Sequence, residues 1–117
     1  MAMKYKIYDL IGENCMTQQA GQQVYDLIYP ELQAGQPVEL DFAQVRRFLS
    51  VFFNFALGQL LRDIKAEDLD RLLIVSNLNP IGQQAYDRVL ENAQHYYSDE
   101  MYRKAVDEMV QEQSLYS

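Results

Sequence analysis

The period of the apolar residues changes several times along the chain, and this alternation constrains the fold more than any other feature. The segments typical of β-strands are residues 5–10, 38–42 and 72–75, the last being apolar throughout, as in a strand buried on both faces. The segments that repeat every three or four residues, as amphipathic helices do, are residues 17–30, 50–64, 80–97 and 98–110. Strands that alternate with helices favour crossover connections and a sheet covered by helices.

Residues that start and stop helices support these boundaries. Pro30 is expected to kink or end its helix because proline lacks the backbone N–H. Ser50 is a good N-cap, and Asn79-Pro80 is a strong helix start. The charged stretch from Lys65 to Asp70 is typical of a surface loop. We therefore predict a small α/β domain with a mostly parallel or mixed sheet of three to four strands and an additional C-terminal helix.

Length and charge limit the class of protein. The chain has 117 residues, which fits one domain, with a core from 5 to 97 and an extra helix and tail from 98 to 117. The net charge of −7 and the scattered basic residues argue against nucleic-acid binding. No apolar run is long enough to span a membrane, and a single Cys fits a reducing cytoplasm.

The residue types that carry catalysis or bind cofactors are sparse. The five glycines are isolated and form no phosphate-binding loop, and no spacing of Cys or His is typical of a metal site. His95 falls on the polar side of its predicted helix, and Cys15 has no second thiol or triad partner in view. We expect no enzyme activity, no cofactor and no metal.

Three polar residues are candidates for binding a ligand or a phosphate. Asp41 and Asn77 follow apolar strands, and ligands collect at the carboxyl ends of parallel strands. Ser50 opens a predicted helix, where free backbone amides stabilise a phosphate. Ordinary turn and capping roles explain the same residues. A small ligand-binding domain or enzyme built on Asp41, Ser50 and Asn77 is therefore the alternative to a protein-binding module.

An ordered set of motifs between Val38 and Tyr97 resembles a known family. The chain reads VELDFAQV from residue 38, then Ser50, FNFALGQLL from 53, LLIVSN from 72 and VLENAQHYY from 89. This set is similar to the bacterial STAS-like domain family of unknown function. The residues that carry the resemblance are Asp41, Phe42, Ser50, Asn54, Gly58, Glu91, Asn92, Ala93, Tyr96 and Tyr97.

That family is similar in turn to the anti-sigma-factor antagonists. These are cytosolic switch proteins that bind a kinase-like ATPase, which turns them off by phosphorylating a serine in an Asp-Ser-Ser-Gly turn. Counted without gaps from Leu57-Gly58, the four positions fall on residues 49–52, so that the second serine is replaced by Val51. The resemblance implies a regulatory module that binds a kinase-like ATPase or an anti-sigma-type regulator and has lost the usual phosphoserine position.

The helix from Ser50 supplies the predicted partner-binding surface. A helical projection places Phe53, Ala56 and Leu57 on the core side, with Val51, Phe52 and Phe55 opposite. Exposed aromatic residues usually mark an interaction site. The predicted partner-binding residues are Ser50, Val51, Phe52, Asn54, Phe55 and Gly58. Two alternatives stay open: the helix from Asp99 covers the two phenylalanines, or the chain associates with itself.

Overall fold

The computed structural model describes residues 2–98, so the extra helix predicted from 98 to 117 lies outside the described residues. The elements are, in order, β1 (Met3–Lys6), α1 (Ile7–Ile11), β2 (Asn14–Cys15), α2 (Gln18–Gln33), β3 (Val38–Asp41), β4 (Arg47–Phe48), α3 (Ser50–Ala56), the 3-10 helix η1 (Gly58–Arg62), α4 (Ala66–Leu72), β5 (Leu73–Ser76) and α5 (Pro80–Ser98).

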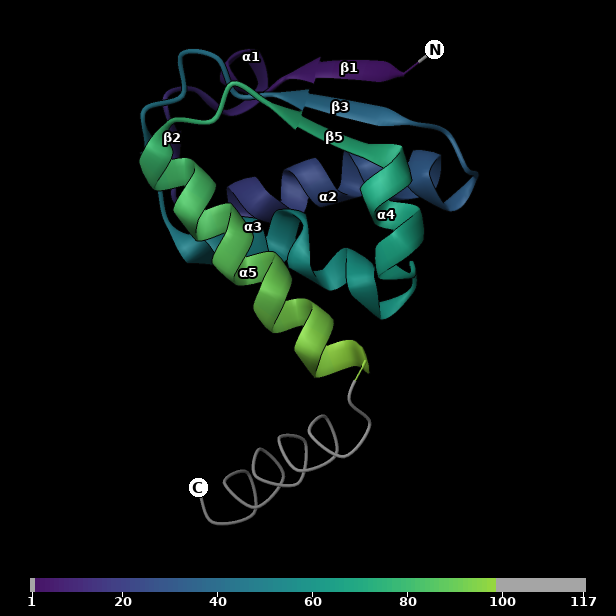
Figure 1. The fold of residues 1–117 in the computed structure, drawn as a ribbon. Helices are drawn as coiled ribbons and strands as arrows, with labels where there is room; N and C mark the ends of the chain where they lie inside the picture. Colours follow the sequence, from purple (N-terminus) through teal and green to yellow (C-terminus); the bar gives the residue numbers. More distant parts are fainter. Residues whose placement is uncertain (1, 99–117) are drawn as a thin grey trace.

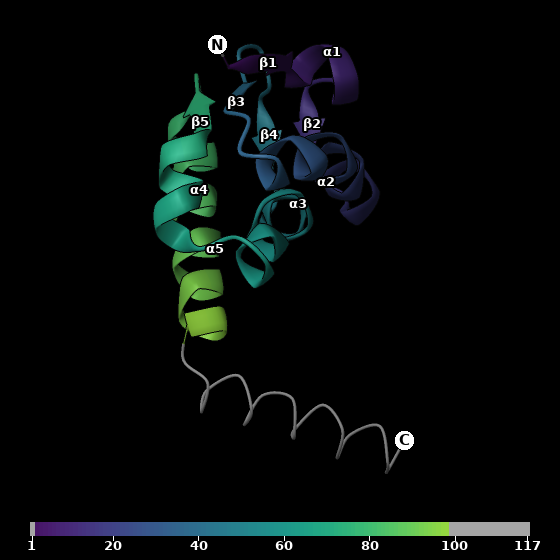
Figure 2. The same ribbon diagram turned by 90° about the vertical axis from the view of Figure 1, so that its right-hand side faces the viewer.

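Three of the strands form one parallel sheet in the order β1-β3-β5. The helices α2, α3, α4 and α5 all lie on one side of this sheet, as Figures 1 and 2 show. The short strands β2 and β4 pair separately, also in parallel. The predicted α/β class, with a parallel sheet covered by helices, is confirmed. Among residues 2–98, the helical layer covers only one face of the sheet.

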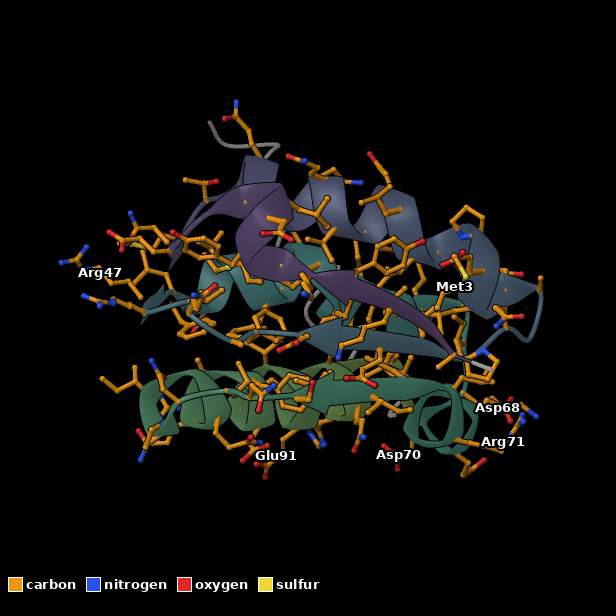
Figure 3. All side chains as sticks on the ribbon, turned by 90° about the horizontal axis from the view of Figure 1, so that it is seen from above. Met3, Arg47, Asp68, Asp70, Arg71 and Glu91 are labelled. Atoms are coloured by element: carbon orange, nitrogen blue, oxygen red, sulfur yellow. The ribbon has the colours of Figure 1, made fainter. Side chains whose placement is uncertain are left out.

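The register of the strands separates an apolar face from a polar face. Met3, Val38 and Leu73 are paired across the sheet, and the next position on the same face holds Tyr5, Leu40 and Val75. This face meets the helices, and Val38 and Leu40 are fully buried. The opposite face, seen from above in Figure 3, carries Lys4, Lys6, Glu39, Asp41, Ile74 and Ser76.

A cluster of aromatic rings fills the core between the sheet and α3. The rings of Phe48 and Phe53 are stacked with centroids 5.6 Å apart, and Phe52 meets Phe53 edge-on at 5.3 Å. Phe42, just after β3, contacts all three of these rings. Such pairs stabilise a fold beyond the area that they bury. The cluster holds α3 and the loop before it in place.

Two short segments differ from the prediction. Residues 7–11 form helix α1 instead of continuing a strand, because Ile7 and Ile11, four residues apart, both turn inward. The stretch predicted as a charged loop is helix α4. There Leu69 and Leu72 are buried three residues apart. Glu67 near the start and Arg71 near the end interact favourably with the helix dipole and stabilise the helix.

The longer helices begin where the sequence predicts, but their ends differ. The Thr17 hydroxyl caps α2 by accepting from the N–H of Ala20 at 3.0 Å, and the Asn79 side chain caps α5 through Gly82 at 2.7 Å. Helix α2 passes through Pro30 and ends three residues later, at Gln33. The helix predicted to reach Ile64 breaks at Leu57, whose φ of −127° leaves the helical region.

Candidate partner-binding surface

Ser50 is the first residue of α3 and is exposed to solvent. The capping position belongs to Leu49, whose φ of −124° and ψ of 150° are extended. The prediction that Ser50 is the N-cap is therefore wrong by one residue. The helix begins one residue earlier than predicted. The N–H of Leu49 pairs with the carbonyl of Cys15, so the pairing of the small sheet continues up to the start of the helix.

Phe52 does not lie on the outer face of α3. Its side chain is fully buried, as is that of Phe53, so the prediction that Phe52 lines an exposed surface is wrong. Helix α2 covers that side: a Cβ added to Gly21 would lie 2.5 Å from the carbonyl oxygen of Phe52. A helix that is apolar on all sides is a buried helix, and α3 lies between α2 and α5.

The other predicted residues of α3 lie at or near the surface. Asn54 is exposed, and Val51 and Phe55 are half-buried. Gly58 is buried against α5, where an added Cβ would lie 3.3 Å from Val89 Cγ1. Three of the predicted residues, Asn54, Phe55 and Gly58, therefore lie together where α3 and η1 meet α5.

A hollow of about 390 Å³ lies between these elements. Neither of its walls carries a charged side chain among the lining residues that the structure describes. The lining residues are Asn54, Phe55, Gly58 and Gln59 from α3 and η1, and Asn92, Ala93, Tyr96 and Tyr97 from α5. The prediction missed the contribution of α5 to this surface. The only signal in the sequence is the ENAQHYY motif, which carries four of those residues.

Asp41 and Asn77 meet at the carboxyl ends of β3 and β5. The Asn77 side-chain amide donates to Asp41 Oδ1 at 2.8 Å, and the N–H of Ala43 donates to the same oxygen at 2.9 Å. These two hydrogen bonds hold the pKa of Asp41 below its usual value. Asn77 has φ of 61°, a left-handed conformation that asparagine tolerates.

Ser50 is not part of this junction, because it makes no hydrogen bond to Asp41 or Asn77. Asp41 also lines a small hollow of about 110 Å³ with Lys6, Tyr8, Asp9, Ala43 and Gln44, and Ser50 is not among these residues. The three candidate ligand residues are therefore divided between two places. The structural role of joining two strand ends is sufficient to explain the Asp41–Asn77 pair without a ligand.

The remaining chemically reactive residues are dispersed. Cys15 is fully buried, and burial raises its pKa to about 12, so its thiol is unreactive at neutral pH. His95 is exposed on α5. Residues 2–98 contain no group of three or more His, Cys, Asp or Glu side chains placed to hold a metal ion. Within the same residues no helix is both long and apolar enough to cross a membrane.

Comparison of the chain with curated proteins and with solved structures gives no match. Comparison with protein families gives one match, over residues 20–83, which is more than half of the chain. The matched range contains five of the residues that carry the resemblance described above, namely Asp41, Phe42, Ser50, Asn54 and Gly58. The chain belongs to the family described as STAS-like domain of unknown function (DUF4325).

Proposed function

We propose that the chain is a cytosolic regulatory module that binds another protein and performs no catalysis. The partner is of the kinase-like ATPase or anti-sigma type that the family resemblance suggests. The observation that carries this proposal is the uncharged surface where α3 meets α5, with Phe55 and Asn54 on one wall and Tyr96 and Tyr97 on the other. Aromatic side chains beside amide groups are typical of protein interfaces.

The start of α3 extends this surface toward the position of the usual phosphoserine. Leu49 is 48% exposed and Ser50 is exposed, while Val51 at the phosphoserine position has no hydroxyl group. Binding through this surface is therefore regulated by something other than a phosphate on residue 51. The apolar side chain of Val51 at that position instead adds area that a partner can bury.

The alternative, a ligand-binding domain or enzyme, receives less support. A nucleophile or base needs a partner within hydrogen-bonding distance, and Ser50 has none in the described part of the chain. Asp41 already accepts two hydrogen bonds from its own chain. A protein-binding role uses the exposed residues of α3 without requiring either group to react.

The test begins with capture of the partner from lysate of the source cells. An Asn54→Cys variant is labelled with a photo-activated maleimide; the native Cys15 is buried and stays unlabelled. A Gln23→Cys variant, labelled on the exposed face of α2, is the control. We expect one protein to be crosslinked from position 54 and not from position 23.

Affinity for the purified partner then decides the proposal. Asn54→Arg places a bulky cation on the surface and should weaken binding by about tenfold or more, because interface centres tolerate such changes poorly. Gln23→Arg makes the same kind of change elsewhere and should leave affinity unchanged. Both positions are exposed, so the melting temperature should not move. Equal affinity of the two variants would exclude the α3 surface as the binding site.

A further inference from the structure

The sheet ends on one side at β5, which has no further strand beside it among residues 2–98 (Figure 3). Ser76 directs its carbonyl inward, to the N–H of Phe42 at 2.9 Å. Since backbone groups of successive residues point to opposite sides of a strand, Leu73 and Val75 direct theirs outward. The N–H of Leu73 pairs with Leu69 of α4. The outer edge therefore offers the N–H and C=O of Val75 and the C=O of Leu73.

The two edges of the sheet differ in how they are protected. At the opposite edge, β1 carries the exposed Lys4 and Lys6, and lysine on an edge strand opposes the addition of another strand. Strand β5 reads LIVS and has neither a charged residue nor a proline. Its Ile74 is 45% exposed on the open face of the sheet. Of these two edges, therefore, only the β5 edge is suited to pairing with another strand.

The helices beneath β5 carry more negative than positive charge. In Figure 3, Asp70 of α4 lies beyond β5, on the side away from β3. Together α4 and α5 carry five carboxylates and two guanidinium groups.

We propose that the outer edge of β5 binds an extended segment of a partner protein as an added strand, and that this segment alternates apolar residues with Lys or Arg. Side chains of an added strand point alternately to the two faces of the sheet. Those on the helix side come near Asp70 of α4, where cations are favoured. Those on the open side lie beside Ile74, where apolar residues are favoured.

A basic partner suits this edge better than a second copy of the chain. Two copies paired through β5 would bring Asp70 and the other acidic residues of α4 from both molecules together, and each molecule has a net charge of −7. Like charges facing each other oppose association. The edge is also separate from the α3 surface, so this inference stands or falls independently of the proposed function.

The test uses the full chain and two short blocked peptides labelled with a fluorophore. One alternates Val with Lys and the other alternates Val with Glu over the same length. We expect anisotropy titrations to show the lysine peptide binding about tenfold or more tightly. Hydrogen exchange followed by NMR should show protection of the Val75 amide on addition of the lysine peptide, because that N–H gains a partner.

Variants locate the bound peptide. Val75→Pro removes the outward N–H while the ladder to β3, made by Ile74 and Ser76, stays intact, and should weaken binding about fivefold. Asp70→Asn should weaken it about twofold or more. The control, Asp9→Asn, removes one exposed carboxylate from α1, so the net charge is the same and affinity should not change.

Three results would overturn the inference. The first is equal binding, or no binding, of the two peptides. The second is binding of the lysine peptide without protection of the Val75 amide, which would place the peptide elsewhere. The third is a dimer that Val75→Pro separates in the absence of peptide, which would make a second copy the occupant. The amide measurement uses the unaltered chain and does not depend on any variant folding.

Discussion

Asp41 connects all three strands of the main sheet. It ends β3, accepts from Asn77 after β5, and lies with Oδ2 3.7 Å from Lys4 Nζ on β1. Asp41 is buried, with 7% of the residue exposed, and its charge persists because these groups satisfy it. The sequence places Asp41 and Asn77 at strand ends. It does not reveal their hydrogen bond, which depends on the register of strands far apart in the chain.

Acid should weaken the fold through Asp41. The hydrogen bonds from Asn77 and Ala43 lower its pKa in the folded state below the ordinary 3.8, so the unfolded chain takes up the proton first as pH falls. The stabilising contribution is fully present well above pH 3.8 and is lost as pH falls through the lowered pKa. Urea unfolding between pH 7 and pH 3 should show a smaller loss of stability in Asp41→Asn than in the unaltered chain. Asp9→Asn, an exposed control, should keep the full loss, and an equal loss in both variants would contradict this role.

Within β5, adjacent residues should respond differently to the same truncation. Leu73 is 7% exposed and faces the helices, whereas Ile74 faces the open side of the sheet. Leu73→Ala should lower the free energy of unfolding by about 2–5 kcal/mol, as buried leucine truncations do. Ile74→Ala should cost less than about 1 kcal/mol. Denaturant titrations of the two variants measure this difference. Similar losses would show that the open face is covered in solution.

At the scale of elements, the sequence predicts the long segments better than the short ones. The apolar run at residues 72–75 predicts a strand correctly but burial on both faces wrongly, because the run cannot show that Ile74 faces away from the helices. Helix α4 is hidden because charges surround its two buried leucines. The position of Phe52 follows from the close approach of α2 at Gly21, which no projection of α3 alone contains.

Seen as a whole, the described part of the molecule has one covered sheet face and one open face. Parallel sheets are usually covered on both faces, and the open face here is made compatible with water by ion pairs such as Lys4 with Glu39, at 3.8 Å. This arrangement depends on which side every crossover helix takes. The predicted alternation of strands and helices gives the parallel sheet, but the sequence pattern is the same for helices on one side or on both.

Net charge should control whether the open edge of β5 pairs with another copy. At pH 7 the charge of −7 keeps molecules apart, and near the pI of about 4.5 this repulsion disappears. Light scattering should therefore show monomers at pH 7 and growing assemblies near pH 4.5. Ile74→Lys places a cation beside the edge and should suppress assembly, since edge lysines oppose strand pairing. Leu27→Lys makes the same change in charge on the exposed face of α2, so equal suppression by both variants would assign the effect to net charge and exclude the β5 edge as the point of contact.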